Sequence, residues 1–143
     1  MARWRLFSRN EPPQSSWQVF AWWESRRIPY NIIVGAVGMV SGSLCLVTAL
    51  LTEHFLGEAL GLPNPPIVAV FAVMIYGVMA NICYTGGWIT EIFVRKVWPH
   101  EGEAFGKISF FLGLAFSVFL TLAPGVLIAC LGAVSLFIHA PIR

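Results

Sequence analysis

Four polar residues inside one long apolar stretch have the spacing of a binding face. Asn81, Tyr84, Trp88 and Glu91 are separated by three, four and three residues. On a helix they share one face about 80° wide. Because an amide or a carboxylate without a partner is costly in an apolar environment, such a face indicates either a functional site or a contact with another helix.

A second polar group lies around the start of the first apolar stretch of the chain. Its members are Glu24, Arg26, Arg27, Tyr30 and Asn31. A carboxylate near the membrane surface requires a cation or water. We therefore expect Arg26 or Arg27 to pair with Glu91 across helices, or Arg95 to do so from one turn along the same helix. Two interpretations remain open for these nine residues: an anchor at the membrane surface without a ligand, or a polar pocket for a lipid headgroup, a quinone or a peptide.

Metal and cofactor chemistry has weaker support. His54 and His139 are expected at the same membrane boundary, and two histidines on different helices can hold a metal ion or haem. The chain lacks the deeper paired histidines of a buried haem, so no metal and no cofactor is expected. Cys45, Cys83 and Cys130 have no metal-ligand spacing and are predicted to pack between helices, with a Cys45–Cys130 disulfide as the alternative.

Three apolar stretches must position these residues: 28–51, 67–94 and 108–138. Each exceeds the ~20 residues that a helix needs to cross a bilayer. The composition agrees, because 57% of the residues are hydrophobic and 11% are charged, far from the roughly 25% charge of a soluble domain. The chain is therefore predicted to be an all-α integral membrane protein with three transmembrane helices in a domain over 28–143. The net charge of +2 gives no basis for a nucleic-acid partner.

The residues before the first span are predicted to form two further segments. Residues 1–14 form a basic, irregular tail. Residues 15–27 form an interfacial amphipathic helix whose apolar face carries Val19, Phe20, Trp22 and Trp23. Pro29 predicts a bend between this surface helix and the first span. The alternative is that the tryptophans pack on a partner protein.

Small residues in two spans predict close helix packing. The first span carries Gly35, Gly38 and Gly42, the last two as a GxxxG pair. In the third span small residues recur every four positions, at Gly113, Ser117, Thr121, Gly125, Ala129 and Ala133. Pro124 precedes one of them and predicts a kink. A turn between two half-length helices at Pro124-Gly125 is the alternative.

The positions of Lys and Arg predict an orientation. Arg3, Arg5, Arg9, Arg26 and Arg27 precede the first span, and Arg95, Lys96 and Lys107 follow the second. The connector between spans one and two has neither residue. The positive-inside rule therefore places the N-terminus in the cytoplasm and the C-terminus outside, in what we expect to be a bacterial inner membrane.

The predicted role rests on the motifs that the sequence lacks. No nucleotide-binding motif, internal repeat or pair of broken helices appears. We expect a small non-catalytic subunit or accessory protein that packs with itself as a homo-oligomer, or with a larger membrane complex, among membrane lipids. The alternative is a lipid-, quinone- or ion-binding protein, a channel or an enzyme, with a polar site at the cytoplasmic boundary.

Overall fold

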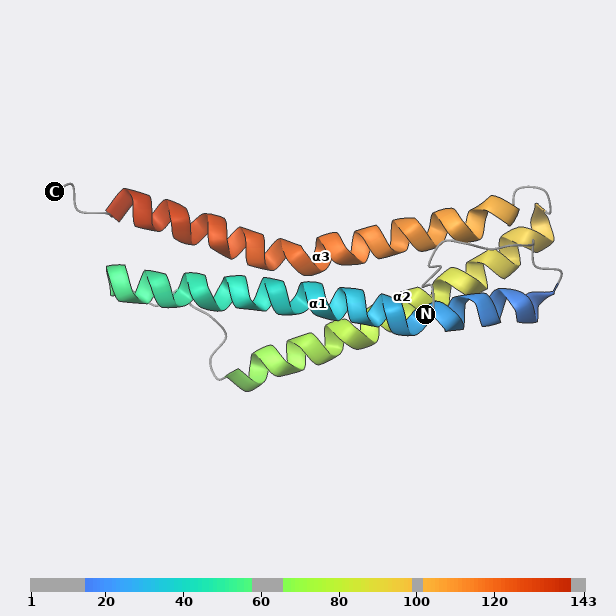
Figure 1. Ribbon diagram of the computed structural model, residues 1–143, viewed down its shortest axis with the longest axis horizontal. Helices are drawn as coiled ribbons and strands as arrows, with labels where there is room; N and C mark the ends of the chain where they lie inside the picture. Colours follow the sequence, from blue (N-terminus) through green and yellow to red (C-terminus); the bar gives the residue numbers. More distant parts are fainter. Residues whose placement is uncertain (1–14, 58–65, 99–101, 140–143) are drawn as a thin grey trace, which may run out of the picture. The chain divides into compact units, whose positions relative to one another are not determined.

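A computed structural model describes residues 15–57, 66–98 and 102–139 of the chain. These residues form three helices and no strand: α1 (Ser16–Leu56), α2 (Pro66–Val97) and α3 (Gly102–His139) (Figure 1). All three are long and apolar enough to cross a membrane. The predicted all-α architecture with three long apolar helices is confirmed, and the predicted tail at 1–14 lies outside the described residues.

The helices extend beyond the apolar stretches that predict them. α1 has 41 residues and continues through Pro29, whereas we expected a separate surface helix over 15–27 and a bend. Proline removes one backbone donor, which membrane helices tolerate where packing holds the backbone. Here Pro29 is buried, and Arg26 and Tyr30 beside it are 8% and 3% exposed. Packing on both sides of the proline therefore carries the helix through it.

α3 continues through Pro124 in the same way. It has 38 residues, and Pro124 lies inside it. The alternative of a turn between two half-length helices at Pro124-Gly125 is therefore wrong.

The helices contribute to two compact units, each described here by itself. Unit 1 takes α1 up to Ile33, α2 from Tyr76 onward and α3 as far as Ser117. Unit 2 takes the rest of each helix. Every Lys and Arg that the structure describes lies in unit 1, so the two units differ sharply in charge.

In unit 2, α1 and α3 approach each other closely at Ser41 and Gly125. The backbone N–H of Gly125 donates to the Ser41 hydroxyl over 3.0 Å. A Cβ on Gly125 would lie 2.7 Å from the Ser41 carbonyl oxygen. Nearby, a Cβ on Gly38 would meet the Thr121 methyl at 3.6 Å. Gly38, Thr121 and Gly125 from the two small-residue rows therefore lie at this approach.

Not every member of the two small-residue rows lies at this approach. Ser117, in unit 1, bonds through its hydroxyl to the Tyr30 hydroxyl over 2.8 Å. A Cβ on Gly35, Gly42 or Gly113 would meet nothing within 4 Å, and Ala133 is exposed. The reason is geometric, because a repeat of four residues drifts about 40° around a helix at each step. Six such positions cannot all face one neighbour, and within unit 2 Thr121 and Gly125, in the middle of the row, contact α1.

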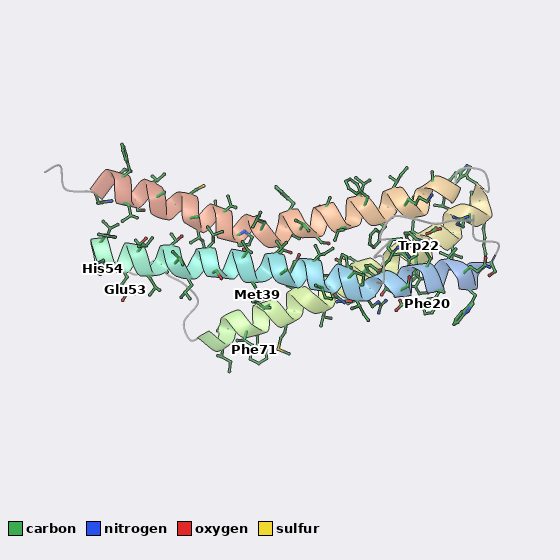
Figure 2. The ribbon with its side chains drawn as sticks, viewed as in Figure 1. Phe20, Trp22, Met39, Glu53, His54 and Phe71 are labelled. Carbon is green, nitrogen blue, oxygen red and sulfur yellow. The ribbon has the colours of Figure 1, made fainter. Side chains whose placement is uncertain are left out.

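Large apolar side chains cover the outside of the helices. Only 17%, 6% and 6% of the most apolar stretch of α1, α2 and α3 is buried. Met39 and Phe71 are examples, at 76% and 57% exposed (Figure 2). Such surfaces are compatible with a membrane location, where lipid tails cover them. The three cysteines are free, so the alternative Cys45–Cys130 disulfide is not formed.

Candidate functional site

Unit 1 brings together all nine residues predicted as a ligand site. α1 and α2 run antiparallel there, and three hydrogen bonds set their register: Trp23 to Glu91, Arg27 to Thr85, and Asn31 to Asn81. The polar face of α2 therefore packs along the first turns of α1, with α3 beside them at Phe110. Residues 16–27, from the segment expected on the membrane surface, are part of this packed unit.

Glu91 is the most deeply buried charged residue that the structure describes. It is 0% exposed. Its carboxylate accepts hydrogen bonds from the Trp23 indole N–H at 2.7 Å and from Arg95 Nε at 2.9 Å. On the α3 side Gly106 lies against the carboxylate so closely that a Cβ there would overlap it. A buried carboxylate is tolerated only when it is paired and hydrogen-bonded, and these contacts provide both.

An aromatic core surrounds this pair. It consists of Trp22, Trp23, Tyr30, Tyr84 and Phe110. Phe110 is 2% exposed and meets Trp22 and Trp23 edge to face, with ring centres 5.7 and 5.6 Å apart. The Tyr84 hydroxyl donates to the backbone carbonyl of Trp23. Edge-to-face rings add about 0.5–1.5 kcal/mol each beyond the area they bury, so this core fixes the position of Trp23 and hence of Glu91.

The remaining polar residues form a partly exposed polar seam between α1 and α2. We define the polar seam as Glu24, Arg27, Asn31, Asn81 and Thr85. Arg27 pairs with Glu24 at 2.8 Å and donates to the Thr85 hydroxyl at 3.0 Å. Asn31 and Asn81 exchange two hydrogen bonds, at 3.3 and 3.0 Å. Asn81 thus has the partner on another helix that its place in an apolar stretch requires.

The ion pairs differ in part from those expected. Arg27 forms its ion pair with Glu24, which lies one turn before it on α1, and not with Glu91. Arg95, the alternative at one turn along α2, is the partner of Glu91. Trp88 packs edge to face on Phe20 at 5.4 Å. Sequence reasoning did not identify Gly87, Gly106 or Phe110 as part of this cluster. The adjacent glycines 86 and 87 are the signal that could have indicated a close approach to another helix.

The two histidines of the weak metal alternative lie in unit 2. His54 stands at the end of α1 beside Glu53 and packs on Phe55 (Figure 2). His139 bonds through Nδ1 to the Ser135 carbonyl. Within residues 15–57, 66–98 and 102–139, no group of three His, Cys, Asp or Glu residues is placed to hold a metal ion.

The chemistry open to the site follows from its burial. Trp23, Tyr30, Tyr84 and Glu91 are each 5% exposed or less. A ligand that reached Glu91 would have to displace Trp23 or Arg95, which bind the carboxylate. The arrangement is therefore suited to hold three helices in register, because its acidic and phenolic groups bind other parts of the chain.

The contact between Gly87 and Trp23 gives the first prediction. A Cβ on Gly87 would lie 2.6 Å from the Trp23 ring, whereas one on Gly86 would meet nothing within 4 Å. Because Glu91, Tyr84 and Phe110 hold Trp23, the ring cannot move aside. Gly87→Ala should lower the free energy of unfolding in detergent by about 1–3 kcal/mol. Gly86→Ala should leave it unchanged or raise it slightly, since alanine favours the helix; equal effects would contradict the contact.

Comparisons with known proteins give no further identification. No family model, no curated protein and no solved structure matches this chain.

Proposed function

We propose that this chain is a small, non-catalytic membrane protein that acts as a subunit or accessory protein and packs with itself or with a larger membrane complex. The observation that carries the proposal is the use of the polar face of α2. Asn81 binds Asn31, and the Tyr84 hydroxyl binds the Trp23 carbonyl. Glu91 binds both the Trp23 indole and Arg95. These residues are the strongest candidates for chemistry in the chain, and they serve helix packing.

The outward surfaces support the same role. The exposed side chains of α1, α2 and α3 are mostly large and apolar. In a bilayer, such a surface contacts lipid tails or the helices of another membrane protein. A protein whose polar groups bind one another and whose apolar groups face outward is well suited to assembly.

Native purification with mass spectrometry of bound lipids and proteins tests this role. We expect the chain to be recovered in a defined assembly, as an oligomer or with other membrane subunits. Recovery of a bound quinone, ion or substrate in one-to-one ratio, lost on Arg27→Gln, would contradict the proposal and favour a ligand site at the cytoplasmic boundary.

The proposed location is the inner membrane of a bacterium, with the N-terminus in the cytoplasm. Arg26, Arg27, Arg95, Lys96 and Lys107 come from three helices and all belong to unit 1. The positive-inside rule then assigns unit 1 to the cytoplasmic boundary. The first apolar stretch begins just after Arg27, so Arg27 lies near the membrane boundary. Because Arg27 binds Thr85, Thr85 lies at the same depth, and the part of α2 that follows it is assigned to the same boundary.

Reporter fusions test this orientation. A reporter that is active only outside the cytoplasm should be active when fused after Arg143 and silent when fused after Gly102, because an odd number of crossings separates the two ends of the chain. Activity after Gly102 would indicate the opposite orientation in the membrane. Silence at both positions would indicate an even number of crossings and contradict three spans.

A further inference from the structure

The polar seam exposes an amide one helical turn inside the first apolar stretch, next to the proposed cytoplasmic boundary. Asn31 is exposed, and it lies four residues into the first apolar stretch. Glu24 and Arg27 in the same seam keep about a third of their side-chain surface exposed. Lipid tails offer no hydrogen bonds, so an exposed amide in the hydrocarbon is costly until something polar covers it.

Asn31 has hydrogen-bonding capacity to spare. An asparagine amide has two N–H donors and an oxygen with two lone pairs. In the described residues the side chain of Asn31 donates once to Asn81 and accepts once from Asn81. One donor and one acceptor site therefore remain. Because the amide offers both, it is complementary to an identical amide.

Charge decides against a lipid phosphate as the occupant. Arg27 is paired with Glu24, and Arg95 is paired with Glu91. Arg26 stacks on the Trp22 ring at 4.0 Å and donates to the Trp22 carbonyl. A phosphate at the seam would be repelled by the Glu24 carboxylate beside Arg27. A neutral amide would instead find a complementary donor and acceptor on Asn31.

We propose that the polar seam is a contact between two copies of this chain, in which Asn31 bonds to the partner's Asn31 across a two-fold axis. Such a contact presents the same patch on both copies, as most homodimers do. Ile28, three residues before Asn31 and therefore on the same side of α1, is 68% exposed and supplies apolar area beside the amide. The inference rests on the proposed function, because it names the partner of an assembly protein.

Dimerisation of the full chain in lipid vesicles tests the seam. Energy transfer between donor- and acceptor-labelled copies, measured at decreasing protein-to-lipid ratio, gives the dissociation constant. Asn31→Leu should weaken the dimer roughly five- to tenfold, since interhelical hydrogen bonds in bilayers average only ~0.6 kcal/mol and two are lost. Asn81→Leu removes the same bonds within the chain but keeps Asn31, so it should lower thermal stability without weakening the dimer.

Cysteine cross-linking locates the contact. In a chain with Cys45, Cys83 and Cys130 changed to serine, Ile28→Cys should form a cross-linked dimer in membranes. Phe116→Cys, equally exposed at 65% but on α3, should not. A monomer at every protein-to-lipid ratio would overturn the seam contact, as would a dimer that Asn31→Leu leaves unchanged. A monomer recovered with other subunits would still leave the proposed assembly role intact, so the two failures are distinguishable.

Discussion

Gly125→Leu is expected to destabilise the protein by about 3 kcal/mol, at the upper end of the usual cost of overpacking. A Cβ at this position would lie 2.7 Å from both oxygens of Ser41 and 2.8 Å from its Cα. Two of these three atoms belong to the backbone of α1, so no side-chain rotation relieves the overlap. The larger leucine would force the helices apart and break the hydrogen bond from the Gly125 N–H to Ser41. Thermal unfolding in detergent measures the loss.

Two matched variants isolate the effect of the close approach. Gly113→Leu places the same side chain on α3 where a Cβ meets nothing within 4 Å. Leu127→Ala removes apolar surface from a residue that is 61% exposed. Both should cost well under 1 kcal/mol, as substitutions away from packed features usually do. A Gly125→Leu protein as stable as the Gly113→Leu protein would show that α1 and α3 do not meet at Ser41.

Removing the charge of Glu91 is expected to cost about 3–5 kcal/mol. Glu91→Gln keeps the shape that fits against Gly106, but it leaves the guanidinium of Arg95, whose side chain is only 16% exposed, without its carboxylate. A buried charge without its partner carries most of its desolvation cost. The expected result is a large fall in thermal stability in detergent, and it should occur whether or not the protein has a ligand.

The Arg95 pairing is tested by a double-mutant cycle. Arg95→Gln alone should also destabilise the protein strongly, and Glu91→Gln with Arg95→Gln should cost less than the sum of the two. Arg27→Gln is the control, because its partner Glu24 is 30% exposed and such pairs contribute about 0–1 kcal/mol. Additive effects at 91 and 95, or a coupling of Glu91 with Arg27, would contradict the observed pairing.

The sequence predicted the three helices because length and apolarity alone determine them. It also predicted that Asn81 binds another helix, since an amide in an apolar stretch requires a partner. The partner of Glu91 was open among three arginines, because all of them lie at a similar depth. The register of α1 against α2 decides between them, and the hydrogen bonds of Trp23, Arg27 and Asn31 to α2 set that register.

The helix boundaries were less predictable for a related reason. Pro29 reads as a break when α1 is considered alone, because proline removes a donor. In the folded chain Arg26, Pro29 and Tyr30 are all buried, so contacts with other helices outweigh that local preference. Likewise, a four-residue repeat of small side chains indicates close packing without indicating which members take part.

The antiparallel pairing of α1 with α2 has a consequence for biogenesis, because α1 is synthesised before the residues that it binds. Trp23 leaves the ribosome 68 residues before Glu91, and Tyr30 leaves it 87 residues before Ser117. At about 5–20 residues per second, these partners appear several seconds after α1 is complete. During that interval Asn31 has no Asn81 to bind. Until α2 is synthesised, the polar side chains of the nascent first helix therefore need temporary hydrogen-bonding partners. Water, lipid headgroups or the insertion machinery can provide them.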